Sequence, residues 1–199
     1  MNRIEYLKKN IKEILILSAV TEDSVHSENT LEWLLKLNPD ADEALCIAAL
    51  GHDIERAINK RKIKRQDYKS YDQFKEAHAL NSAVILKEIM IKCKLRPEFI
   101  EDVYSLICRH EAGGDKRSDL LKNADAISFF QVNLPLYYTR NNKKETKRRC
   151  LWGFKRLSSD LIKVAIDFRY DDNYLESLVR NCAHHPSNHP ERNRGDRPS

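Results

Sequence analysis

The sequence predicts an all-helical protein on the basis of three observations. The 199 residues are 41% hydrophobic and 33% charged, a composition typical of globular proteins. Only five glycines and six prolines occur, and three of the prolines fall within the last 14 residues, so the body of the chain is poor in turn-forming residues. Apolar residues recur at helical spacing, and no segment alternates convincingly like a strand. We therefore expect about eight or nine helices in one domain over residues 1–182.

Each expected helix combines an apolar face with recognisable ends. The first covers 2–19, and a break in the pattern at 21–25 separates it from the second. Pro39 ends the second helix, Asp40 caps the third, and Pro97 occupies the first turn of the fifth. The remaining helices are predicted over 25–37, 41–60, 72–93, 97–110, 118–133, 142–157, 159–169 and 172–181.

Polar segments are expected to lie outside these helices. Residues 59–70 are basic and form a loop, and 111–118 contains adjacent glycines and forms a connection. The helix over 118–133 breaks at Pro135. The tail, 183–199, is polar, contains prolines and has no apolar anchor, so we expect it to be disordered.

Cysteine content, hydrophobicity and net charge limit the cellular compartment and the binding partners that we expect. The five cysteines are odd in number and widely spaced, so we expect free thiols and a cytoplasmic protein. The apolar run at 14–20 is too short to span a bilayer and lacks a signal-peptide layout, so no membrane partner is expected. A net charge of +5 is modest and does not by itself indicate nucleic-acid binding. A homodimer is left open.

Side chains that carry chemistry fall on apolar helix faces. His52 and Asp53 each continue an apolar stripe of the segment before them. Asp125 lies one turn from Leu121 and from Phe129. Every histidine outside the tail lies in a predicted helix: His26, His52, His78 and His110.

Buried carboxylates are costly unless they are paired or bind metal, so Asp53 and Asp125 require a positive partner. Buried imidazoles do not supply that charge, because burial lowers their pKa. A single histidine on an apolar face is more often a hydrogen-bonded core residue, and Asp125 alone could cap a helix or pair with an arginine. The joint pattern favours a divalent metal, and neutral imidazole with carboxylate suits Mn, Fe, Co, Ni or Zn.

The order of these residues resembles that of the HD-domain superfamily of metal-dependent phosphohydrolases. Members of that superfamily are helical and bind metal through one histidine, a later His-Asp pair and a final aspartate. The matching segments are SVHSENTLEWLL with His26, EALCIAALGHDIERAI with His52-Asp53, and LLKNADAISFF with Asp125. The resemblance covers about residues 20–130 and is specific as a set.

The resemblance also implies further ligands. Some HD families add two histidines and bind two metal ions, and here FKEAHALNSAVIL offers His78 and VYSLICRHEAGGD offers His110. The site is therefore expected to hold one or two ions, with His78 and His110 either as ligands or as neighbours of the ligands. Many members place an acidic residue or Gly-Lys soon after the pair, whereas this chain has Ile54-Glu55-Arg56. Glu55 either assists proton transfer or is an exposed salt-bridge partner, and the exposed role is slightly favoured.

The expected activity is hydrolysis of a phosphate ester by a metal-activated water, with a nucleotide or another small phosphorylated metabolite as substrate. The residues expected to act are, for catalysis, Asp53, Glu55 and His78 and, for substrate binding, Arg56, Lys60 and Arg61. One alternative is a di-iron oxygenase built on the HD fold. Another is a non-catalytic regulatory module that binds a nucleotide or phosphate.

A basic stretch at 143–156 interleaves lysines and arginines with Trp152 and Phe154. Such a pattern could contact a nucleotide or a nucleic-acid backbone. An amphipathic helix with a solvated basic face also explains the pattern and is favoured, so nucleic acid is not expected as a partner. The residues expected to face inward are Cys150, Leu151, Phe154 and Leu157.

Overall fold

The computed structural model describes residues 2–184. Every regular element within this range is helical, which confirms the predicted fold class. The tail predicted to be disordered at 183–199 lies outside the described residues, apart from its first two, of which Ala183 ends the last helix. The ten α-helices of the described residues are α1 (Arg3–Ile16), α2 (Glu22–Leu37), α3 (Glu43–Gly51), α4 (Tyr71–Lys92), α5 (Pro97–Arg109), α6 (Lys116–Ser128), α7 (Leu134–Arg140), α8 (Lys143–Arg156), α9 (Ser159–Ile166) and α10 (Asn173–Ala183).

Side-chain caps explain where several helices begin. Asp42, rather than the predicted Asp40, caps α3 by accepting a hydrogen bond from the backbone of Leu45. Ser70 and Gln73 form a reciprocal capping box at the start of α4. Pro97 opens α5, as predicted, because the first turn of a helix does not need its missing N–H group.

A break separates the first two helices, as predicted, but it lies at 17–21 rather than at 21–25, because helix α2 begins at Glu22. Glu22 and Asp23 occupy its first turn, where the helix dipole favours acidic groups, and both side chains are buried. Glu22 accepts a hydrogen bond from Arg140 (3.0 Å), and Asp23 pairs with Arg56 (2.9 Å). These partners lie far along the chain, so local sequence gave no sign that the two acids could be buried.

Helix α3 ends at Gly51 instead of continuing to residue 60. His52 closes the helix, and Asp53 leaves it with φ −105° and ψ 15°, before a 3-10 turn at Ile54–Ala57. A Cβ atom at Gly51 would lie 2.5 Å from Leu86 Cδ2, so the end of α3 approaches α4 closely. Tertiary packing, rather than the local apolar pattern, therefore sets the position of the His-Asp pair.

Replacing Gly51 by alanine should lower the free energy of unfolding by about 1–2 kcal/mol. Overpacking costs about 1–3 kcal/mol, and the higher helix propensity of alanine offsets up to about 1 kcal/mol of it. Urea denaturation measures the effect. In a Leu86→Ala background the same substitution should cost less, because Leu86 is the fully buried obstacle. Equal costs in the two backgrounds would contradict the close contact.

The predicted break at Pro135 is also wrong. Helix α6 continues through a π-helical turn at Phe129–Asn133 directly into α7. Pro135 lies in the first turn of α7, where a proline is tolerated. The wider π turn lets the chain remain helical across a position at which an ordinary α-helix would lose a hydrogen bond.

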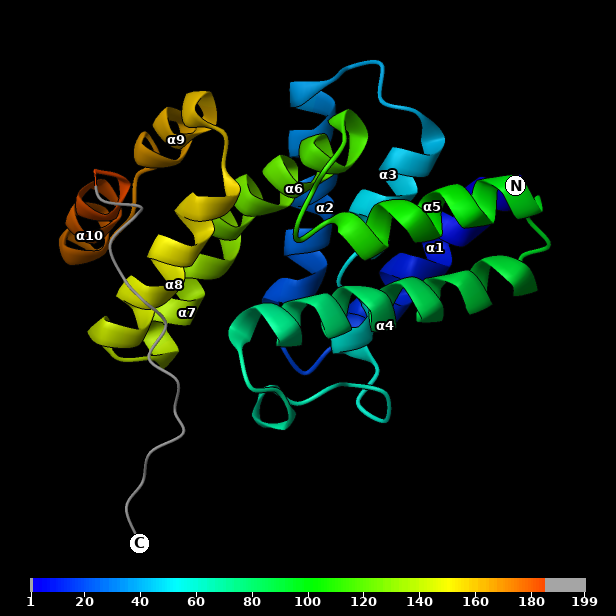
Figure 1. The fold of residues 1–199 in the computed structure, drawn as a ribbon, viewed down its shortest axis with the longest axis horizontal. Helices are drawn as coiled ribbons and strands as arrows, with labels where there is room; N and C mark the ends of the chain where they lie inside the picture. Colours follow the sequence, from blue (N-terminus) through cyan, green and yellow to red (C-terminus); the bar gives the residue numbers. More distant parts are fainter. Residues whose placement is uncertain (1, 185–199) are drawn as a thin grey trace, which may run out of the picture.

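The core consists of two clusters of buried apolar side chains. One is built by α1–α6 and the other by the end of α6, the π turn and α7–α10. Figure 1 shows α1, α3, α4 and α5 on one side of the molecule and α7–α10 on the other, with α2 and α6 between them. No helix within residues 2–184 is long and apolar enough to cross a membrane.

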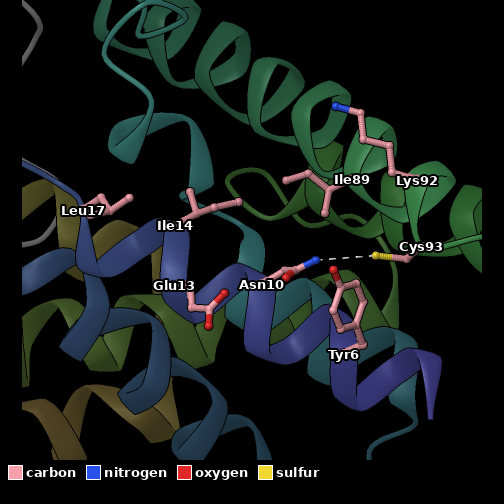
Figure 2. Close-up of a pocket in the computed structure, with 8 residues that line it drawn as sticks. All are labelled: Tyr6, Asn10, Glu13, Ile14, Leu17, Ile89, Lys92 and Cys93. Carbon is pink, nitrogen blue, oxygen red and sulfur yellow. Dashed lines mark hydrogen bonds between the residues drawn. The ribbon is translucent and has the colours of Figure 1, made fainter. Parts of the chain in front are cut away.

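A surface groove of about 360 Å³ lies between α1 and α4 (Figure 2). Asn10 donates a hydrogen bond to Cys93 Sγ (3.8 Å) at one end of it. None of the predicted site residues lines this groove, so the predicted chemistry has to be sought elsewhere. The residues that line it are Tyr6, Asn10, Glu13, Ile14, Leu17, Ile89, Lys92 and Cys93.

Candidate metal centre

The six residues predicted to bind metal converge in one buried cluster. They come from α2, α4 and α6 and from the C-terminal ends of α3 and α5, and each is at most 5% exposed. The possible ligand atoms of this region form three groups. Inside each group the atoms lie within 4.8 Å of one another, so each group could hold a metal ion. The groups are His26, His52 and Asp125; Asp53, His78 and His110; and His110, Glu111 and Asp125.

Two of the histidines are held in the same way at the ends of helices. His52 Nδ1 donates a hydrogen bond to the carbonyl of Ala49 (2.9 Å), and His110 Nδ1 donates one to the carbonyl of Ile107 (2.7 Å). A carbonyl can only accept, so Nδ1 carries the proton in both rings. Each Nε2 is therefore left facing the interior of the cluster.

The other two histidines are also oriented through Nδ1. His26 Nδ1 lies 2.8 Å from Ser128 Oγ, whose hydroxyl donates to the carbonyl of His26, so the imidazole is the donor. His78 Nδ1 donates to Glu55 Oε1 (2.8 Å). With Nδ1 occupied by an outer partner, all four Nε2 atoms face the cluster and can bind a metal once they carry no proton; partners of this kind at the outer nitrogen are typical of metal-binding histidines.

The inner nitrogens meet the two aspartates. Asp125 Oδ1 lies 3.0 Å from His26 Nε2 and 3.5 Å from His52 Nε2. The Nε2 atoms of His26 and His52 are 3.3 Å apart. Asp53 Oδ1 lies 2.6 Å from His78 Nε2 and 3.8 Å from His52 Nε2. Nitrogen and oxygen donors of this kind match the preferences of first-row transition metals.

Glu55 is a buried part of the centre, so the exposed salt-bridge role favoured from the sequence is wrong. Its side chain is 2% exposed. Besides His78 Nδ1, it accepts hydrogen bonds from the backbone of Ile63 (3.1 Å) and from Asn81 Nδ2 (3.0 Å). Burial would raise the pKa of Glu55, but the hydrogen bond from His78 and further contacts lower it, which keeps the carboxylate charged.

Glu111 belongs to the cluster although the sequence did not single it out. Its Oε1 lies 3.2 Å from His110 Nε2. Its two carboxylate oxygens pair with Lys75 and Arg156, whereas His110 Nε2 is buried without a hydrogen-bond partner among residues 2–184. Glu111 lies directly after His110 in a segment predicted only as a connection, and adjacency to a candidate ligand was its one signal. A buried imidazole nitrogen without a hydrogen-bond partner, next to a carboxylate, fits a bound cation.

Arg56 pairs with a carboxylate of the centre. Its guanidinium lies 2.9 Å from Asp53 and 2.9 Å from Asp23. The sequence predicted that Arg56 binds substrate; in the structure its partners are carboxylates, and the substrate-binding role stays a prediction. Asp23 also accepts a hydrogen bond from Ser18 (2.6 Å), so Arg56 links Asp53 to the start of α2.

Arg156 enters the cluster from α8. It contacts Asp125 and lies 3.1 Å from Glu111, which also contacts Lys75. The predicted amphipathic helix is confirmed, because Cys150, Leu151, Phe154 and Leu157 are buried. Arg156 is buried as well, at 7% exposure, which the basic pattern of this stretch did not reveal.

The charges of the cluster do not balance within the protein. The carboxylates outnumber the cations by two, which gives a net charge of −2 when all imidazoles are neutral; a single divalent ion would cancel it. The carboxylates are those of Asp23, Asp53, Glu55, Glu111 and Asp125, and the cations are Arg56, Lys75 and Arg156.

The metal-free chain balances part of this charge by protonation. Burial opposes a charge on His52, but Asp53 and Asp125 outweigh burial and raise the pKa of His52 to about 9. The sequence argument that burial keeps the imidazoles neutral is thus wrong for His52. It is right for His110, whose pKa is lowered by burial. Neighbouring positive groups overcome burial and lower the pKa of Asp53 and of Asp125 well below the usual range.

The two remaining residues predicted to bind substrate lie beyond the cluster. Lys60 is exposed, and the guanidinium of Arg61 pairs with Glu88 of α4 (2.6 Å). In the described part of the chain, no hydrogen bond or ion pair joins either side chain to a candidate ligand. Their substrate-binding role stays a prediction.

The fold and the site together define an all-helical protein with a buried histidine–carboxylate cluster able to hold metal. The chain belongs to the family described as "Domain of unknown function (DUF4202)", which matches residues 9–179. No curated protein and no solved structure matches the chain.

Proposed function

We propose that this protein is a metal-dependent phosphohydrolase of the HD type. The observation that carries the proposal is the shared orientation of four buried histidines, each donating through Nδ1 and directing Nε2 toward carboxylates. We assign His26, His52, Asp53 and Asp125 to one ion, because Asp53 lies 3.9 Å from His26 Nε2 and 3.8 Å from His52 Nε2. Asp53 also groups with His78 and His110, which are available for a second ion. The donor set suits Mn, Fe, Co, Ni or Zn.

When bound, such an ion polarises a phosphate oxygen and lowers the pKa of a bound water. The protein supplies the rest. Asp53 and His78 share a contact of 2.6 Å, and Glu55 holds the far side of His78, so these three side chains form a path for a proton. Arg56 and Arg156 add positive charge beside the candidate ligands, where phosphate oxygens need compensation. A nucleotide or another small phosphorylated metabolite is the proposed substrate.

The proposal is tested by measuring product release from nucleotides, dinucleoside polyphosphates and simple phosphate esters. Metal-stripped protein is supplied in turn with Mn, Co, Ni, Fe, Mg and Zn, with Asp53→Ala as the control. We expect turnover that requires metal and is absent in Asp53→Ala. Absence of turnover with every metal, despite bound ions, would reject the hydrolase. Oxygen consumption by the iron-loaded protein would then support the oxygenase, and nucleotide binding without turnover would support the regulatory module.

Replacing Glu55 by glutamine should weaken metal binding and turnover about 10–100-fold, because the carboxylate that orients His78 loses its charge while the side-chain volume is kept. Calorimetry measures metal affinity, and steady-state kinetics measure turnover. Glu88→Gln is the matched control, because Glu88 is exposed and, among the residues that the structure describes, its side chain pairs with Arg61 alone. Equal metal affinity and turnover in the two variants would show that Glu55 has no part in the site.

A further inference from the structure

Arg149 lies on α8 in a setting built from aromatic side chains. Its guanidinium carbon is 4.2 Å from the ring centre of Tyr71 and 5.5 Å from that of Tyr137. Its Nε donates a hydrogen bond to Tyr137 Oη (3.3 Å). Only 21% of the side chain is exposed, so the rings hold the guanidinium in a fixed position.

The charge of Arg149 is incompletely compensated. Its nearest carboxylate, Glu145, is 3.6 Å from Nε, and the same carboxylate pairs with Arg148 at 2.8 Å and accepts a hydrogen bond from Tyr137. Within residues 2–184, no hydrogen bond uses the terminal amino groups of Arg149. The terminal amino groups of Arg149 are not among the buried polar atoms that lack a partner, so they are open to solvent, and their planar arrangement matches a phosphate or carboxylate group.

An aromatic pair connects Arg149 to the candidate metal centre. The ring of Tyr71 packs edge-on against Trp152, with the ring centres 5.1 Å apart. Lys75 and Arg156 lie over Trp152, at 5.3 Å and 4.7 Å from its ring centre. Those two cations contact carboxylates of the cluster, whereas Arg149 lies one aromatic pair further out and keeps its donors free.

We propose that Arg149 binds a second anionic group of the substrate, remote from the phosphate that reacts. The substrate class is then a small phosphate ester that carries a further phosphate or carboxylate. The inference rests on the proposed function, because the metal cluster holds the first anion. It assigns a specificity role to the one inward arginine of α8 that contacts no candidate metal ligand.

The test uses calorimetry on the full chain, metal-free and Mn-loaded. The probes are phosphonocarboxylates of increasing chain length, each beside the alkylphosphonate of the same length, because neither is hydrolysed. We expect one length at which the wild type prefers the phosphonocarboxylate. Arg149→Gln should weaken binding of that phosphonocarboxylate about 10–100-fold and leave binding of the alkylphosphonate unchanged. The affinity of Arg149→Lys for the phosphonocarboxylate should lie between those of the wild type and Arg149→Gln.

Arg148→Gln is the matched control on the same helix, because Arg148 is 60% exposed and also pairs with Glu145. Thermal melting of each variant establishes that it folds, and Arg149→Lys keeps the test open if the glutamine variant does not. Unchanged preference in both Arg149 variants would overturn the inference. An Arg149-dependent preference without hydrolysis of any ester would support this anion site while rejecting the hydrolase.

Discussion

Replacing Arg156 by leucine should lower the free energy of unfolding of the metal-free protein by about 3–5 kcal/mol. Arg156 is 7% exposed and lies against Asp125 and Glu111, so its removal leaves buried Asp125 without its arginine and leaves Glu111 with Lys75 alone. The loss is large because a buried charge that has lost its partner cannot regain its hydration.

The measurement is urea denaturation of the wild type and the variant, each with and without divalent metal. A metal ion that binds the same carboxylates should recover part of the lost stability, which a purely structural arginine far from the site would not show. Arg148→Leu on the exposed face of α8 is the control and should change stability by less than about 0.5 kcal/mol. A similar small effect in Arg156→Leu would mean that Arg156 does not compensate the cluster.

The candidate ligands were predictable because their signal is local. An aspartate or histidine that continues an apolar stripe, as His52, Asp53 and Asp125 do, is buried whatever the precise helix ends. The all-helical class followed from the same periodicity. Helix ends were harder to predict. Helix α3 stops where Gly51 meets Leu86, and this contact between two helices is encoded by no local pattern.

The compensating charges were not predictable for the same physical reason. In the sequence Arg156 resembles the exposed Arg148 of the same basic run, and only the packing of α8 against α6 turns it toward Asp125. Glu111 follows a candidate ligand but lies in a turn, where side-chain direction has no simple period. Ion pairs between residues that are distant in the sequence decide these roles, and a single sequence carries little information on such pairs.

Stabilisation by metal should grow with pH between about 6.5 and 9 in this protein. In the metal-free chain the pKa of His52 is raised from 6.5 to about 9, so protonated His52 stabilises the fold fully below pH 6.5. That contribution, on the order of 3 kcal/mol, is lost as the pH rises through about 9. A metal ion bound at His52 Nε2 takes the place of this proton, so the loaded protein has no such loss.

The measurement is a set of thermal melts and calorimetric titrations over this pH range, with and without metal. Below pH 9 the ion must displace the proton on His52, and this competition weakens as the pH rises. Metal affinity should therefore rise up to about tenfold per pH unit, with release of a proton on binding. Saturating metal, at about 1,000 times its dissociation constant, adds about 4 kcal/mol of stability. His52→Gln should abolish both the pH dependence and the tight binding. A metal affinity that does not change with pH would show that the ion displaces no proton from His52. That result would contradict the role of His52 as a metal ligand and favour a cluster held together by its own ion pairs.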